Sequence, residues 1–198
     1  MSDPPKRGRP RTLDTEKTLD VAIRAYWRQD PADVSLNAIC TLAGVSKPAL
    51  YRQFGSEDGL MRAVLDRYAT QVLSDIFDIL SRDMPPEDTL AALTHFAGTD
   101  DKMETGCVFY KMRAGKHRLG PMTRAGVEAI DAGAVTALTA YFKARHAAGD
   151  WAGEPPAATV ARYVVEQIGL ALSPRAAGHD PQEVRDTLAL AFSALRRP

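Results

Sequence analysis

Apolar residues near the start of the chain recur at the spacing of an amphipathic helix. The positions i, i+3, i+4 and i+7 are filled by Leu19, Ala22, Ile23 and Tyr26, and Trp27 extends the same patch. An Asp-Pro pair follows at residues 30–31, and the residue before a proline disfavours helical backbone. The pattern therefore predicts a helix that begins near Asp14 and ends before residue 30.

Two short helices and one long helix are predicted next, each beginning at a serine. A serine hydroxyl accepts a hydrogen bond from the free amides of a helix start, and Ser35, Ser46 and Ser56 stand at such positions. Gly44 and Gly55 end the two short helices, since glycine tolerates the backbone conformation of a helix end. The long helix keeps an apolar face from residue 60 to residue 79 and ends at the Met-Pro-Pro run of residues 84–86.

The same periodicity predicts which side chains the two short helices bury. In the first short helix, the residues expected on one inward face are Leu36, Ile39, Leu42 and Ala43. In the second, the inward residues are expected to be Ala49, Leu50 and Phe54. The other side chains of the second helix are then free to meet solvent or a partner.

Helical periodicity continues through the rest of the chain, and no stretch alternates as a half-buried strand does. Further helices are expected over residues 87–97, 107–117, 121–147, 157–173 and 181–195. The predicted fold class is all-α, with a long fourth helix joining an N-terminal three-helix unit to a C-terminal bundle. The predicted domains are a flexible basic arm over 1–12, a helix-turn-helix domain over 13–70 and a helical domain over 71–198.

Composition excludes several classes of protein. The chain has 198 residues, of which 45% are hydrophobic and 25% charged, as in ordinary globular proteins. No apolar run approaches the roughly 18 residues of a membrane span, and the polar start is unlike a secretory signal. The two cysteines are too few for a disulfide scaffold. We therefore expect a cytoplasmic protein that does not enter the membrane.

Charge is balanced overall but concentrated at the N-terminus. The net charge is zero, yet four bases fall within six residues, namely Lys6, Arg7, Arg9 and Arg11. A basic arm ahead of a neutral domain is typical of a nucleic-acid contact, and a solvated tail is the alternative.

The segment from Ser35 to Phe54 reads SLNAICTLAGVSKPALYRQF. Two short helices joined through Gly44 fit a helix-turn-helix, with Val45 between the helices and Leu50 beneath the second. A plain helical hairpin is the alternative. In the helix-turn-helix interpretation, the residues expected to face DNA are Ser35, Ser46, Lys47, Pro48, Ala49, Tyr51 and Arg52. Among these, Lys47 and Tyr51 can donate to phosphates, and small neighbours let the helix enter the major groove.

The longer run VSKPALYRQFGSEDGL resembles the recognition-helix signature of TetR-type transcriptional regulators. The resemblance covers about residues 14–70, and one departure is Glu57, where members often have a phosphate-contacting lysine. It implies a sequence-specific regulator of double-stranded DNA, most simply a ligand-responsive repressor that binds a palindromic operator as a homodimer. In this context Arg7, Arg9 and Arg11 resemble an AT-hook core that reads a narrow minor groove.

The resemblance also implies that the last two helices, within residues 157–195, dimerise. One helix offers an apolar stripe of Val160, Val164, Ile168 and Ala171. The other offers Val184, Leu188, Ala191, Phe192 and Leu195. The alternative is that both stripes serve only the core of one protomer.

An unknown small-molecule effector is expected in the C-terminal bundle. The candidate pocket residues are Met103, Cys107, Phe109, Tyr110, Met112 and Trp151. Cys107 is interpreted as a packed thiol rather than a redox sensor, although Lys102, Lys111 and Arg113 are near it in sequence. The histidines lack ligand-like spacing, so no metal and no cofactor are predicted.

Two other classes of function compete with the ligand-gated repressor. An enzyme is disfavoured, because no nucleotide-binding or metalloprotease motif is present. An effector-independent DNA-binding or protein-docking regulator without a pocket remains open. A well-formed cavity in the C-terminal bundle favours the ligand-gated repressor, and a solid core favours the effector-independent regulator.

Overall fold

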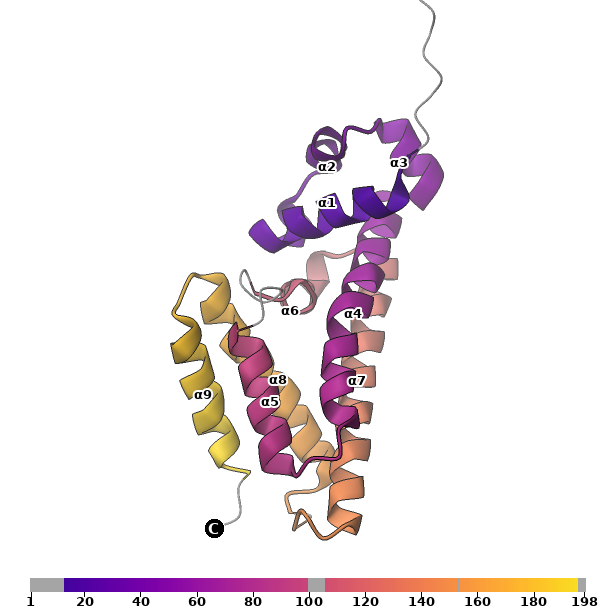
Figure 1. Ribbon diagram of the computed structural model, residues 1–198. Helices are drawn as coiled ribbons and strands as arrows, with labels where there is room; N and C mark the ends of the chain where they lie inside the picture. Colours follow the sequence, from indigo (N-terminus) through magenta and orange to yellow (C-terminus); the bar gives the residue numbers. More distant parts are fainter. Residues whose placement is uncertain (1–12, 100–105, 153, 196–198) are drawn as a thin grey trace, which may run out of the picture.

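The computed structural model describes residues 13–99, 106–152 and 154–195, and every regular element in these ranges is a helix (Figure 1). The N-terminal elements are α1 (Thr15–Arg28), the 3-10 helix η1 (Pro31–Asp33), α2 (Leu36–Ala43) and α3 (Lys47–Phe54). The middle of the chain forms α4 (Glu57–Ser81), α5 (Pro86–Thr99), α6 (Val108–Ala114) and the 3-10 helix η3 (Lys116–Arg118). The C-terminal helices are α7 (Pro121–Ala147), α8 (Ala157–Ala176) and α9 (Pro181–Ser193). The prediction of an all-α fold is confirmed.

The N-terminal helices begin and end where the sequence predicts. The hydroxyl oxygens of Ser35, Ser46 and Ser56 accept hydrogen bonds from backbone amides three residues later, at 3.2, 3.4 and 2.9 Å. Gly44 and Gly55 end α2 and α3 with φ of 67° and 77°. Because other residues adopt positive φ only at a cost, glycine at these two positions sets the short turns on either side of α3.

The N-terminal helices stand at one end of a helical body in which α4 runs beside α7 (Figure 1). On the other side of this body, α5 packs against α8 and α9. The α4 helix is continuous from the N-terminal unit into the body, and it passes residue 70 without a break. The domain boundary at residues 70–71 therefore stays a prediction.

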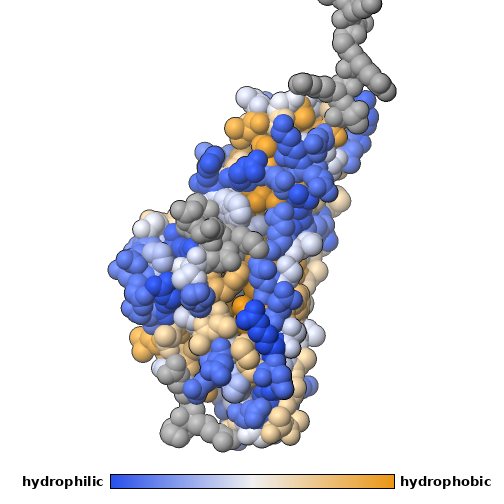
Figure 2. Space-filling model, viewed as in Figure 1, coloured by the Kyte–Doolittle hydropathy of each residue, from blue (hydrophilic) through white to orange (hydrophobic). Residues whose placement is uncertain are grey.

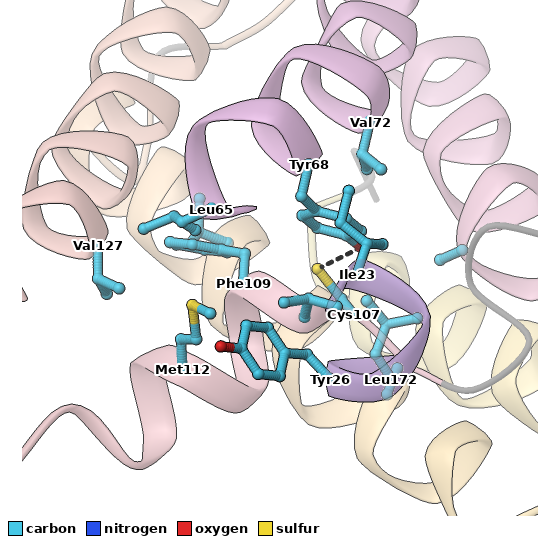
Figure 3. Packing of buried hydrophobic residues seen from close by; sticks show 14 of the residues in the cluster. Ile23, Tyr26, Leu65, Tyr68, Val72, Cys107, Phe109, Met112, Val127 and Leu172 are labelled. Carbon is cyan, nitrogen blue, oxygen red and sulfur yellow. Dashed lines mark hydrogen bonds between the residues drawn. The ribbon is translucent and has the colours of Figure 1, made fainter. Parts of the chain in front are cut away.

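One hydrophobic core connects the two parts. Tyr26 of α1 packs beside Met112 of α6, and Tyr68 of α4 meets Cys107 at the start of α6 (Figure 3). The side chains of Tyr26 and Tyr68 are each only 1% exposed. Burial of such aromatic rings contributes strongly to the free energy of folding, so these contacts hold the N-terminal unit against the body.

The prediction that Leu42 lies on the buried face of α2 is wrong. Its side chain is 62% exposed, whereas Leu36 and Ile39 are buried. At 100° per residue, Leu42 lies about 120° around the helix from Leu36, and an eight-residue helix contacts its neighbours over a narrower arc. Ala43, which lies nearer the inner face, is partly buried instead.

Within the described residues, no helix is both long enough and apolar enough to cross a bilayer. The face drawn in Figure 2 is mostly hydrophilic, with separate hydrophobic patches.

Candidate nucleic-acid interface and apolar cavity

The α3 helix presents most of its predicted DNA-facing residues to solvent. Lys47, Pro48 and Arg52 are exposed, and Tyr51 is 41% exposed. On the opposite side Leu50 is 1% exposed and holds the helix to the core. The Lys47 ammonium lies 5.8 Å from the centre of the Tyr51 ring, so the two groups form one cation–aromatic surface patch.

The other residues predicted to contact DNA differ in their exposure and in whether the structure describes them. Ser35 and Ser46 are exposed and accept capping hydrogen bonds, and each hydroxyl still has its own hydrogen to donate. Ala49 is partly buried. Arg7, Arg9 and Arg11 of the predicted minor-groove arm, at 7–11, lie outside the described residues.

The first turn of α4 fixes the end of α3. A Cβ atom at Gly59 would lie 2.0 Å from the backbone oxygen of Phe54, so only glycine allows this approach. The sequence pattern did not single out Gly59, because its requirement arises from the packing of α4 against the end of α3.

Asp58, in the same first turn of α4, caps a helix of the body. Its carboxylate accepts hydrogen bonds from the backbone amides of Met122 and Thr123 at 2.8 and 3.0 Å, and from the Thr123 hydroxyl at 2.6 Å. Gly120, the N-cap residue of α7, has no side chain to do this, and a Cβ there would lie 2.3 Å from the Asp58 carboxyl carbon. The N-terminal unit thus supplies the cap of α7 in place of a local side chain.

A second contact continues this junction one turn along α4. The Arg62 guanidinium donates to the backbone oxygen of Met122 at 3.2 Å and to the carboxylate of Asp66. A Cβ at Gly126 would lie 2.9 Å from the Arg62 side chain. Two glycines of α7 and its N-cap, Gly120 and Gly126, therefore make room for the side chains of α4.

We expect Asp58→Asn to lower the free energy of unfolding by about 0.5–2 kcal/mol at neutral pH, because the amide keeps one acceptor oxygen where the carboxylate offers two and loses the favourable charge at the start of α7. Burial alone would raise the pKa of the Asp58 carboxyl, but hydrogen bonds from Thr123 and Met122 outweigh it and hold the pKa below its ordinary value. The contribution is thus complete above the ordinary aspartate pKa of about 4 and is lost as pH falls through the lower folded-state value.

Urea denaturation of both proteins from neutral to acidic pH measures this effect. The matched control is Asp78→Asn, an exposed position on the same helix. A stability difference between wild type and Asp58→Asn that stays constant into strong acid would contradict the assignment of the cap to the ionised carboxylate.

A third junction joins α6 and η3 to the N-terminal unit. The Lys111 ammonium donates to the backbone oxygen of Trp27 near the end of α1, where carbonyl groups lack helical partners. The Arg118 guanidinium of η3 pairs with the carboxylates of Asp30 and Asp33. Movement of α6 would therefore be transmitted to α1.

The helical body contains an apolar cavity of about 140 Å³. It lies among α4, α5, α6, α7 and α8, and its wall includes Tyr68, Val72, Phe77, Leu93, Phe109, Tyr110, Ala137 and Leu172. The Tyr68 hydroxyl donates to the Cys107 sulfur at 3.2 Å (Figure 3), and the Tyr110 hydroxyl donates to the Val165 backbone oxygen at 2.8 Å. The polar groups of the wall thus have partners within the protein.

Three of the six residues predicted for the pocket line this cavity, namely Cys107, Phe109 and Tyr110. Met112 is buried elsewhere, beside Tyr26 (Figure 3). Trp151 packs against Phe142, with ring centres 5.2 Å apart. Met103 and Lys102 lie outside the described residues. Most of the wall comes from α4, α5, α7 and α8, and the sequence pattern did not predict that these helices line the same cavity.

The surroundings of Cys107 favour the thiol over the thiolate. The residue is 6% exposed, and burial raises its pKa. The nearby cations are engaged elsewhere, Lys111 with the Trp27 backbone and Arg113 with Glu166 and Asp131. These contacts support a packed thiol. No group of His, Cys, Asp and Glu suited to a metal ion occurs within the described part of the chain.

Comparison with known proteins places the N-terminal unit in a family. Residues 19–64, from α1 to the first turns of α4, match the sequence model of bacterial regulatory proteins of the tetR family. The chain is 40% identical over 62 residues to the HTH-type transcriptional repressor ComR of Escherichia coli, a segment that spans 31% of this chain and 30% of that protein. It is 31% identical over 86 residues to the uncharacterized HTH-type transcriptional regulator Rv1255c of Mycobacterium tuberculosis, 41% of each chain. The chain therefore spans less than half of the length of these curated relatives.

Solved structures resemble the whole fold. The reduced form of NemR from E. coli superposes with a TM-score of 0.79 at 16% identity, covering 93% of this chain and 98% of NemR. A cysteine mutant of CifR, complexed with operator DNA, gives a TM-score of 0.79 at 20% identity and covers 95% and 100%. These names denote regulators rather than enzymes, in agreement with the sequence prediction. With the family sequence matched across residues 19–64 and the fold of TetR-family regulators found across the described chain, the N-terminal unit of this protein is a helix-turn-helix domain of the tetR family.

Proposed function

We propose that the protein is a ligand-responsive repressor that binds a near-palindromic operator as a homodimer. The observation that carries the proposal is α3, a short helix anchored by Leu50 whose outer side presents Lys47, Tyr51 and Arg52. A helix held this way fits the major groove, with side chains that donate to phosphates and base edges. The curated relative ComR is named a transcriptional repressor, which supports the same assignment here.

A single α3 offers too few base contacts for high specificity, and two half-sites in one operator supply more. The mobility of genome-derived DNA fragments selected with the purified full chain tests this directly. We expect the protein to retain a small set of duplexes with inverted-repeat symmetry. Equal retention of all duplexes would refute sequence-specific regulation.

The homodimer is proposed to form through α8 and α9, but not through the two predicted stripes. Most residues of those stripes pack inside the protomer, as Val164 and Leu188 do with 0% exposure each, and the others are partly buried. The exposed apolar side chains of these helices are instead Leu170 and Leu190, at 65% and 75%. Large exposed apolar side chains on the last two helices are suited to a partner surface.

We expect Leu190→Asp to raise the dimer dissociation constant by at least about 100-fold. Burial of a leucine contributes about 1.5–3 kcal/mol, and a two-fold interface loses that contribution twice. Light scattering after size exclusion, over a dilution series, measures the effect. Leu42→Asp, at an exposed leucine of α2, is the matched control and should remain dimeric. An unchanged Leu190→Asp dimer would place the interface elsewhere.

The cavity supports ligand response over effector-independent binding. An effector-independent DNA-binding regulator needs no cavity in its helical body, whereas this body contains one of about 140 Å³ beside α4, the helix that follows α3. Release of selected operator DNA by compounds that bind the cavity distinguishes the two functions.

A further inference from the structure

From the cavity wall we infer that the effector is a neutral, single-ring molecule of about the size of benzene or toluene, without an ionised group. The inference rests on the proposed ligand-responsive function and specifies its ligand. It follows from three properties of the cavity, namely its volume, the absence of charge in its wall and the occupied state of its few polar groups.

Volume sets the size of the ligand. An engineered protein cavity of about 150 Å³, lined by Leu, Ile and Phe, stays dry and binds benzene. The cavity described here has nearly the same volume, about 140 Å³, and its largely apolar wall also includes Leu, Ile and Phe side chains. A two-ring compound would need the packed helices around it to separate, which costs favourable contacts.

The wall excludes a charged ligand. Among the described residues that line the cavity there is no Asp, Glu, Lys, Arg or His. Arg113 comes shortly after the wall residue Tyr110 in the sequence, but it is not in the wall and pairs with Asp131 and Glu166. A carboxylate or ammonium group inside would lose its hydration without gaining a partner, and such burial is strongly unfavourable.

The wall also disfavours a ligand that depends on hydrogen bonds. The two phenol groups that line it already donate, Tyr68 to the Cys107 sulfur and Tyr110 to the Val165 backbone oxygen. A strongly polar ligand would have to break these bonds, whereas a hydrocarbon ring leaves them in place. Aromatic rings of the wall, such as Phe109 and Phe77, suit the faces and edges of such a ring.

The ligand can reach this site without unfolding the protein. Phe77 of α4 lines the cavity and is 49% exposed, so the cavity meets the surface at this side chain. In the same wall, α7 contributes the small residues Gly133 and Ala137. A Cβ at Gly133 would meet nothing within 4 Å, which shows open space at this edge.

The experiment compares toluene with benzoate, which has a similar ring but carries a charge. Calorimetry and thermal unfolding of the full chain measure binding. At ten times its dissociation constant, toluene should raise the unfolding midpoint by about 3–6 °C. Benzoate should bind at least about 100-fold more weakly. Benzoate affinity equal to that of toluene, or no binding of either benzene or toluene, would overturn the inference.

Two cavity variants and one control variant locate the binding. Ala137→Phe places a ring in the cavity and should weaken toluene binding at least tenfold, whereas Ala132→Phe, at an exposed position of α7, should not. Ile130→Ala enlarges the cavity and should shift preference toward naphthalene, which keeps the test informative if Ala137→Phe does not fold. Equal toluene affinity in all three variants would overturn the site.

Operator release is measured separately, with the DNA selected above. Toluene that binds the cavity and releases no operator upholds the ligand class and refutes the gating in the proposed function. Operator release by benzoate with an affinity that Ala137→Phe leaves unchanged refutes the ligand class while the gating stands.

Discussion

The double variant Lys47→Ala, Tyr51→Ala should lose at least about 100-fold in affinity for selected operator DNA. Both side chains are exposed on α3, and the contact described for them is the one between the Lys47 ammonium and the Tyr51 ring. A hydrogen bond to a charged group such as phosphate contributes about 1.5–3 kcal/mol, and a homodimer loses each contact twice. Because phosphate contacts carry little sequence information, weakening should be similar across operator sequences.

The salt dependence of binding separates the two side chains. Loss of the Lys47 ammonium should flatten the slope of log affinity against log salt by about 0.9 for each phosphate contact, and Tyr51→Phe should leave the slope unchanged. Mobility shifts at several salt concentrations provide the measurement. The control is Lys143→Ala, which removes an exposed charge from α7, far along the chain from α3. Tight, sequence-selective binding by the double variant would show that α3 is not the recognition helix.

Operator DNA and the cavity ligand should weaken each other's binding by the same factor, about 5–150-fold, which corresponds to a coupling of about 1–3 kcal/mol. The structure offers a route for this coupling. Tyr68 lines the cavity and donates to Cys107 at the start of α6, and Lys111 of α6 holds the backbone of Trp27 in α1. Tyr68 also meets the Trp27 ring edge-on, with ring centres 5.9 Å apart. A ligand that shifts the Tyr68 ring, while the bond from its hydroxyl to Cys107 is kept, would therefore move α6 and Trp27 and change the position of α1.

Lys111→Met tests this route, because it removes the hydrogen bond to Trp27 while the residue is not part of the cavity wall. We expect the ligand affinity of the DNA-free variant to be retained and the coupling factor to fall toward one. Lys116→Met, whose ammonium pairs with Glu128 of the body, is the control and should keep the coupling. Calorimetry with and without operator gives both quantities. Full coupling in Lys111→Met would exclude the α6–α1 contact as the connection.

Local sequence signals were sufficient for the helices of the N-terminal unit. Ser35, Ser46 and Ser56 cap their helices as predicted, because a cap depends on residues only a few positions apart. Gly44 and Gly55 end their helices for the same local reason.

Packing between distant helices was beyond the reach of those signals. Periodicity identifies an apolar stripe but not the neighbour that covers it, so the stripes containing Val164 and Leu188 could not be assigned to the protomer core in advance. The wall of the cavity is formed by side chains from five helices, so the sequence of any one segment does not predict it. The contact of Asp58 with α7 joins residues more than 60 positions apart and has no local signature.

The cap that Asp58 supplies has a consequence for hydrogen exchange. The first amides of a helix ordinarily lack a partner and exchange readily with solvent. In this protein the Met122 and Thr123 amides are bonded to a carboxylate of another helix, so they are protected only while the first turn of α4 remains docked on α7. Their exchange rate thus reports local separation of the N-terminal unit from the body, independently of the deeper amides of α7 that open on global unfolding.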